Sequence, residues 1–220
     1  MPGLLLVAID LPDGLAGELH RWYDTEHVPE RLAVAGIGPV TRWNLVSGNL
    51  PRFLALFELG SADVLDSGAY ASLKAAGDTP WTARLRSRFD TVVRLTLHEV
   101  ADYGGQPGTA TACAVAITDV DPVEEQTYRR WYDDHHGPQV AGVTGVVRAR
   151  RFERDGDVPR HVTVIELASP AVLSGAAYTA AKATTPDGGL RDRWRRSQGV
   201  FEVLEAYREA AVTRDGGSER

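Results

Sequence analysis

Two copies of one motif, Trp-Tyr-Asp-X-X-His, occupy residues 22–27 and 131–136 and contain side chains that could move a proton. On a helix the aspartate lies three residues before the histidine, so its carboxylate could hydrogen-bond a ring nitrogen and fix the tautomer. A histidine held in this way could act as a general acid or base, and the tyrosine hydroxyl could stabilise an oxyanion. The predicted catalytic residues are therefore His27, His136, Tyr23, Tyr132, Asp24 and Asp133.

A proline follows each histidine closely, at Pro29 and Pro138. Proline lacks a backbone donor and disfavours helix in the residue before it, so we expect both helices to end there. Each histidine would then lie at a helix C-terminus, where the macrodipole and the nearby aspartate favour the imidazolium form. The sequence thus predicts raised histidine pKa values.

Other side chains around the motifs could contact a small ligand. Arg42 and Arg151 would bind a carboxylate or enolate oxygen if their strands turn them towards the helix. The alternative, which we favour, pairs them across a hairpin with Glu58 and Glu166. The aromatic residues and histidines could also be packing residues whose polar tips reach backbone groups. The predicted substrate-binding residues are Trp22, Trp131, Arg42, Arg151 and His135.

Neither a metal nor a cofactor is predicted. The adjacent His135 and His136 would point about 100° apart on a helix and could not easily chelate one ion. A haem would need an axial ligand, commonly histidine; His20, His98 and His161 are available, and nothing distinguishes them. There is no Gly-X-Gly-X-X-Gly after a strand and no P-loop.

Composition narrows the class of partner. A formal net charge of -6 argues against nucleic acid, which requires a positive patch. No apolar run approaches the roughly 20 residues of a membrane helix, and the N-terminus reads as a strand without the basic start of a signal peptide. The single cysteine, Cys113, lies in an apolar run and fits packing in a reducing cytoplasm. We expect a cytoplasmic protein with a small-molecule substrate.

The motif is part of a longer internal repeat, held at an offset of 109 residues and then 108. Each copy shows the signals of strand, helix, two strands, helix and strand, which is the ferredoxin-like β-α-β-β-α-β order. The predicted organisation is an α+β protein with modules at 1–102 and 109–212, a linker at 103–108 and a disordered tail at 213–220. We expect the two sheets to face each other, so that one chain completes a barrel.

Each copy is predicted to contain four strands and two main helices. The strands are 4–9, 39–47, 52–59 and 90–100, then 112–117, 145–154, 160–167 and 199–208. The helices are 15–27 and 61–76, then 123–136 and 169–184. Residues 81–88 and 191–197 are expected to be short helical or irregular stretches.

The Trp-Tyr-Asp-Thr-Glu-His-Val-Pro segment in a first helix resembles the dimeric α+β barrel superfamily, particularly its EthD-like branch. The resemblance covers both modules. It implies a pseudo-dimeric barrel, in a superfamily that includes cofactor-free cyclases, isomerases, decarboxylases and monooxygenases, haem enzymes, and proteins without known chemistry. Fold alone does not select among these.

These observations leave three functions open. We favour a cofactor-free enzyme that performs cyclisation, isomerisation, dehydration or decarboxylation on a small carbonyl-bearing, aromatic or polyketide-like metabolite. The alternatives are an oxidative enzyme, either a cofactor-free or a haem-dependent monooxygenase, and a non-catalytic binding or assembly module. The two sites need not be equivalent. We favour the first copy, because Glu26 offers a second carboxylate there and the second copy has a helix-loosening Gly137.

Overall fold

The structure is a computed structural model that describes residues 1–154, 156, 161–183 and 195–207. Eight antiparallel strands close into one barrel in the order β1-β3-β2-β8-β5-β7-β6-β4. The predicted α+β fold, with two ferredoxin-like halves that complete a barrel within one chain, is confirmed. The predicted tail at 213–220 lies outside the described residues.

The first half contains four strands, β1 (Gly3–Asp10), β2 (Ile37–Gly48), β3 (Phe53–Leu59) and β4 (Thr91–Asp102). Its helices are α1 (Ala16–Trp22), a π-helical turn (Tyr23–His27), α2 (Val28–Leu32), α3 (Gly68–Ala75) and α4 (Pro80–Arg86), with 3-10 turns at Asp13–Leu15 and Ala62–Asp66.

The second half repeats this order with β5 (Ala112–Asp119), β6 (Val146–Glu153), β7 (His161–Leu167) and β8 (Arg195–Tyr207). Its helices are α5 (Glu125–Trp131), a π-helical turn (Tyr132–His136), α6 (Gly137–Ala141) and α7 (Ala176–Ala183), with a 3-10 turn at Pro170–Ser174. Residues 195–197, expected to be helical or irregular, are the start of β8, where they pair with β5.

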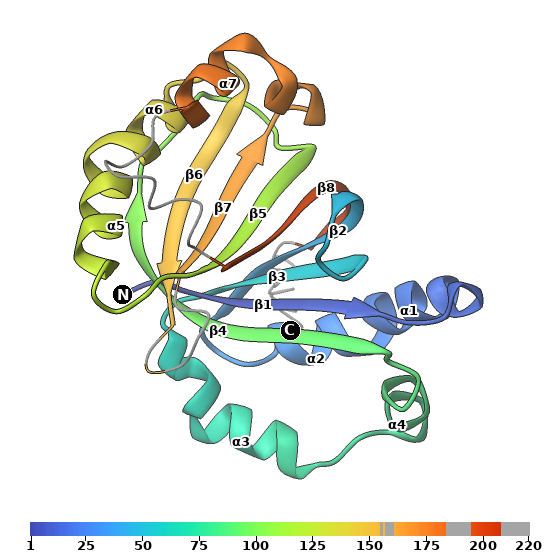
Figure 1. Ribbon diagram of the computed structural model, residues 1–220. Coiled ribbons are helices and arrows are strands. Elements are labelled where there is room, and N and C mark those ends of the chain that lie inside the picture. The colour runs from blue at the N-terminus through green and yellow to red at the C-terminus, as the bar shows by residue number, and fades with distance from the viewer. Residues whose placement is uncertain (155, 157–160, 184–194, 208–220) are drawn as a thin grey trace, which may run out of the picture.

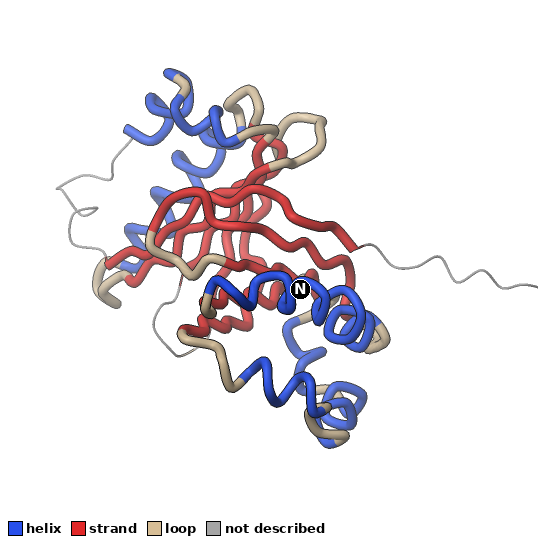
Figure 2. The backbone as a smooth tube through the Cα atoms, turned by 90° about the vertical axis from the view of Figure 1, so that its right-hand side faces the viewer, coloured by secondary structure: helices blue, strands red, loops and turns tan. Residues whose placement is uncertain are grey.

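The two sheets join along their edges as well as sharing a core. β2 pairs with β8 and β4 pairs with β6, so each half supplies the edge partners of the other. Alternate side chains of both halves fill the interior, among them Leu6, Leu97, Val115 and Phe201. Cys113 is buried there, and burial raises the pKa of its thiol. The helices of each half cover the outside of its own sheet (Figures 1 and 2).

A partly buried ion cluster, centred on the buried Arg150, spans one of these seams. Arg150 on β6 makes a bidentate contact with Glu58 on β3 at 2.8 Å for each bond, and it also reaches Glu166 at 2.9 Å and Glu99 at 3.4 Å. The preferred sequence interpretation, in which Glu58 and Glu166 pair with Arg42 and Arg151, is therefore wrong. The register places Ala55 opposite Arg42 and Thr163 opposite Arg151.

The expectation that each first helix stops at its proline is also wrong. In both halves the chain widens into a π turn and then continues as a short α-helix that carries the proline in its first turn. Proline lacks a backbone N–H donor, which is tolerated in the first turn of a helix. Because a new α-helix starts directly after the π turn, each proline lies in such a first turn. No helix among the described residues is both long and apolar enough to cross a membrane.

Candidate active site in the second half

The π turns set the geometry of both motifs. The backbone N–H of Val28 donates to the carbonyl of Tyr23, and that of Gly137 donates to the carbonyl of Tyr132, each five residues back. In an α-helix, residues five apart lie about 140° from each other around the axis. The wider turn brings each histidine back over its tryptophan, with ring centroids 4.2 Å apart in the first half and 4.6 Å apart in the second.

The motif aspartates do not hold the histidines. Asp24 accepts a hydrogen bond from Arg42 at 2.6 Å, and Asp133 accepts two from Arg151 at 2.7 and 3.0 Å. The predicted Asp–His pairs are therefore wrong, and the second-strand arginines bind the helix instead of a ligand. Tyr103, from the segment between β4 and β5, adds a further hydrogen bond to Asp133.

The expected rise in the pKa of His27 is wrong as well. Burial, together with the positive charges of Arg31 and Arg86, lowers the pKa of His27 to about 3. Desolvation of the charged form outweighs any benefit from the helix end. His27 is thus neutral across the physiological range.

In the first half, the space between helices and sheet is filled. Leu5, Phe57 and Leu85 are buried there, with Val7 and Leu73 packed against them. The helix α4 is fixed over this core by polar contacts, in which Trp22 Nε1 donates to Thr82 Oγ1 at 2.8 Å and Trp81 Nε1 donates to Glu18 at 2.9 Å. Thr79 donates to Glu26 at 2.7 Å, so the extra carboxylate of this copy holds α4. Beside Tyr23 and Arg42 there is a void of only about 10 Å³.

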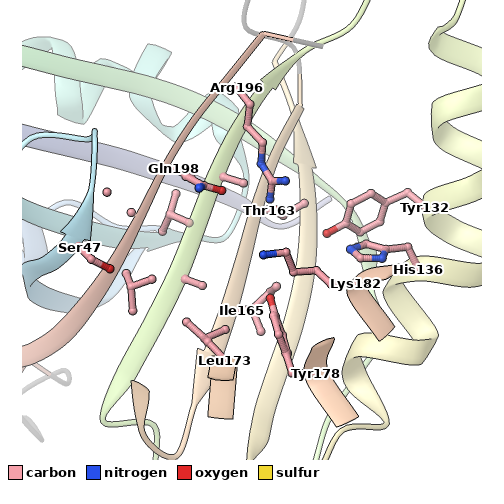
Figure 3. Close-up of a pocket in the computed structure, with 16 residues that line it drawn as sticks. Ser47, Tyr132, His136, Thr163, Ile165, Leu173, Tyr178, Lys182, Arg196 and Gln198 are labelled. Carbon is pink, nitrogen blue, oxygen red and sulfur yellow. The ribbon is translucent and has the colours of Figure 1, made fainter. Parts of the chain in front are cut away.

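In the second half, smaller side chains occupy the equivalent positions and leave a cavity. Ala114 stands where the first half has Leu5, Ala116 for Val7, Ile165 for Phe57 and Ala181 for Leu73. The resulting cavity has a volume of about 240 Å³ (Figure 3). In the first half, His27 lines a polar hollow of about 410 Å³ between helices, but Tyr23 does not line it. The second-half cavity is lined by both the tyrosine and the histidine of its motif, so its geometry favours the second copy over the first.

Two of the predicted catalytic residues line this cavity. Tyr132 and His136 are 7% and 6% exposed, and their rings meet edge to face at 4.9 Å. Figure 3 shows them next to each other on one wall, with Lys182 beside His136 and Gln198 on the opposite side. Thr163, Tyr178, Lys182, Arg196 and Gln198 also line the cavity, and sequence reasoning missed all five.

The remaining predicted residues of the second half do not line it. Trp131 lies behind His136 as its stacking partner, and Asp133 and Arg151 are engaged with each other. His135 is exposed. The cavity thus draws only two residues from the predicted set.

The cavity of the second half does not suit a haem. His20, His98 and His161 do not line the cavity, and His161 is fully buried against the Tyr128 ring at 4.4 Å. The histidine that lines the cavity, His136, is stacked on Trp131. The volume of about 240 Å³ is below the roughly 300–1,000 Å³ of pockets that take drug-sized ligands. The described residues also contain no cluster of three or more ligands that could hold a metal ion.

Comparisons with known proteins identify structures with a similar fold. No protein-family profile and no curated protein matches the sequence. Among solved structures, an anthrone oxidase-like protein superposes with a TM-score of 0.63 at 10% identity, covering 94% of this chain and 92% of that one. A putative monooxygenase of Fusobacterium nucleatum gives 0.62 at 8%, covering 95% of both chains. A chlorite dismutase variant of Candidatus Nitrospira defluvii gives 0.61 at 11%, covering 93% and 92%.

These similarities establish the fold, which is the single-chain α+β barrel found in all three of those proteins. Identities of 8–11% carry no activity with them. None of the comparisons distinguishes the EthD-like branch, so that part of the resemblance stays a prediction.

Proposed function

We propose that the chain is an oxidative enzyme of the cofactor-independent monooxygenase type and that the second-half cavity is its active site. The observation that carries this proposal is the asymmetry between the halves. Both contain the Tyr and His of the motif, but the second half places both on one cavity of about 240 Å³. In the first half the two are separated, because His27 lines a polar hollow of about 410 Å³ between helices and Tyr23 lines a void of about 10 Å³. Fold neighbours named as a monooxygenase and as an anthrone oxidase-like protein support oxidation over the other candidate functions.

The site suits a substrate with a methylene group activated by a conjugated carbonyl. His136 takes a proton from the CH₂ group, and the charge spreads to the carbonyl oxygen, where the Tyr132 hydroxyl donates a hydrogen bond. The carbanion then transfers an electron to O₂, and the carbon radical and superoxide combine into a peroxide anion, which takes the proton back from His136 to give a hydroperoxide. Loss of water leaves a new carbonyl, so that CH₂ and O₂ become C=O and H₂O.

The apolar walls favour this chemistry. Ala114, Ala116, Ile165 and Leu173 surround the polar pair. Hydrogen bonds to a developing oxyanion are stronger in such a low-dielectric space than in water. The same walls would bind an aromatic ring system by burial of its apolar surface.

Acid–base chemistry without oxygen is the second candidate, because the Tyr132–His136 pair contains everything that proton transfer requires. The two candidates share the proton abstraction and differ in the fate of the resulting carbanion. Under argon, an isomerase or cyclase would keep turning over, whereas a monooxygenase would only exchange the methylene protons with solvent.

The test uses anthrone, a three-ring ketone with one activated methylene, in an oxygen electrode. We expect one O₂ consumed for each anthraquinone formed, above the spontaneous rate. His136→Gln should lower the rate by about 10²–10⁴-fold, the usual cost of losing a general base, and Tyr132→Phe should lower it less. The same changes in the first half, His27→Gln and Tyr23→Phe, are the matched controls.

Equal losses from His27→Gln and His136→Gln would contradict the assignment to the second half. A Soret band in the purified protein would contradict the cofactor-independent mechanism. Turnover under argon at the aerobic rate would favour the acid–base candidate.

A further inference from the structure

We infer that the substrate is an anion, specifically an aromatic carboxylate, and that Lys182 and Arg196 bind its carboxylate group. This inference rests on the proposed active site and specifies its substrate class.

The charge of the cavity differs from the charge of the chain. The whole chain has a formal net charge of -6. Among the described residues that line the cavity, Lys182 and Arg196 carry positive charge and none is an aspartate or glutamate. Because the chain as a whole is acidic, the positive side chains at this cavity do not reflect a generally basic surface, and they attract anions locally.

Both cations are placed to reach a ligand. Lys182 is on α7 and Arg196 is on β8, so they approach from two different elements. Figure 3 shows both side chains directed towards Thr163 and the space beside Tyr132 and His136. A guanidinium presents paired donors that match the two oxygens of a carboxylate, and an ammonium adds a point charge.

In the first half the equivalent positions differ in what they contact. Lys74, the equivalent of Lys182, lies over the ring of Tyr70 at 5.2 Å. Arg94 stands where the second half has Gln198, and it contacts the Tyr70 hydroxyl at 3.4 Å. The position of Arg196 holds Val92 instead.

Arg196 therefore stands two residues earlier on its strand than the position equivalent to Arg94, and it lies on the same face of the sheet. The shorter Gln198 takes the place of the arginine that covers Tyr70 in the first half, and Arg196 lies further along β8. The change opens the cavity and keeps a positive charge at it, which is the pattern expected of a site for an anionic ligand.

The size and lining of the cavity specify the rest of the ligand. A volume of about 240 Å³ lies below the range for drug-sized ligands and suits a small fused-ring ligand, and Ala114, Ala116 and Ile165 offer an apolar surface for it. Thus the charged groups bind the carboxylate, and the walls bind the rings.

The test compares two probes of the same shape, 2-naphthoate and its uncharged amide, 2-naphthamide, by isothermal titration calorimetry. We expect 2-naphthoate to bind roughly tenfold more tightly at low salt, since each partly exposed cation contributes modestly. The preference should shrink when salt is raised to about 0.5 M, where charges are screened over a few ångströms.

Lys182→Gln and Arg196→Gln should each lower naphthoate affinity about threefold, and the double variant should remove the preference. Their affinity for 2-naphthamide should not change, which separates loss of charge from damage to the cavity. Lys74→Gln, the equivalent lysine of the first half, is the matched control and should keep the full preference.

Equal binding of the two probes, loss of the preference in Lys74→Gln, or failure of 2-naphthoate to bind at 1 mM would overturn the inference. The experiment needs neither oxygen nor turnover. Selective naphthoate binding without oxidation of anthrone would refute the proposed function alone, and oxidation of anthrone without carboxylate preference would refute this inference alone.

Discussion

At the scale of single residues, the two motifs show that a duplicated sequence does not duplicate a site. His27 and His136 stack on their tryptophans in the same way, but only His136 lines the 240 Å³ cavity. The halves differ in the size of side chains on neighbouring strands, such as Leu5 against Ala114. The chemistry of a motif residue is decided by neighbours that the motif does not contain.

The lowered pKa of His27 predicts a specific pH dependence of stability. The unfolded chain binds a proton at this residue near pH 6.5, whereas the folded chain binds it only near pH 3. The unfolded state therefore binds more protons between these values, and stability falls as pH falls through that window. Relative to His27→Gln, the wild type should lose free energy of unfolding between pH 7 and pH 4.5.

Urea denaturation of both proteins at the two pH values measures this difference, and NMR titration of the His27 ring checks its cause. A ring that titrates near pH 6.5 would contradict the prediction, because the two proteins would then respond to pH alike at this position.

The sequence identified the polar residues of the site better than their partners. The repeat alone singled out Tyr132 and His136, both of which line the cavity. It could not reveal that Asp133 binds Arg151, because that contact depends on the register of β6 against the helix. Aligning the copies residue by residue along the strands would have revealed the large-to-small changes that open the cavity.

At the scale of elements, the segment between the halves distinguishes the motif helix of the second half from that of the first. Gly137 replaces Val28, and a Cβ atom built on it would lie 2.5 Å from the Tyr103 ring. The glycine therefore admits Tyr103, whose ring lies 6.0 Å from that of Tyr132 and whose hydroxyl binds Asp133. Its role is close packing, which the expectation of a loosened helix did not anticipate.

Gly137→Val should accordingly destabilise the protein by about 1–3 kcal/mol, the usual cost of overpacking. In a double-mutant cycle with Tyr103→Ala, the second change should remove most of that cost, because the two residues are in contact. Gly142→Ala, at the end of the same helix, is the control; its Cβ would meet backbone oxygens at an ordinary 3.5 Å. Thermal or urea unfolding provides the measurement, and purely additive effects would contradict the packing explanation.

At the scale of the whole molecule, the repeat was enough to predict the barrel, because each half exposes one apolar sheet face that the other must cover. It was not enough to predict how the halves are joined. The seam between β4 and β6 is short and interrupted by a register shift between Glu99 and Ala101. Arg150 crosses this seam, and no local pattern separates it from Arg148 and Arg151 beside it.

Arg150 should be the most sensitive charged residue for stability. Its side chain is 1% exposed. Burial opposes its charge, but the hydrogen bonds from Arg150 to Glu58 and the charges of Glu166 and Glu99 outweigh this and raise its pKa. Removing one partner of a buried ion cluster leaves unpaired charges, which typically costs about 3–5 kcal/mol. We therefore expect Arg150→Met to lower the free energy of unfolding by that amount in urea denaturation.

Two comparisons separate this explanation from a general effect of losing an arginine. Arg52→Met breaks a surface pair with Asp13, whose side chains are 44% and 94% exposed, and should cost less than about 1 kcal/mol. Adding Glu58→Gln to Arg150→Met removes one stranded carboxylate and should recover part of the loss, because less uncompensated charge stays buried. If Arg150→Met cost no more than Arg52→Met, the seam would be held by its backbone pairing and apolar core, and the ion cluster would be incidental to the closure of the barrel.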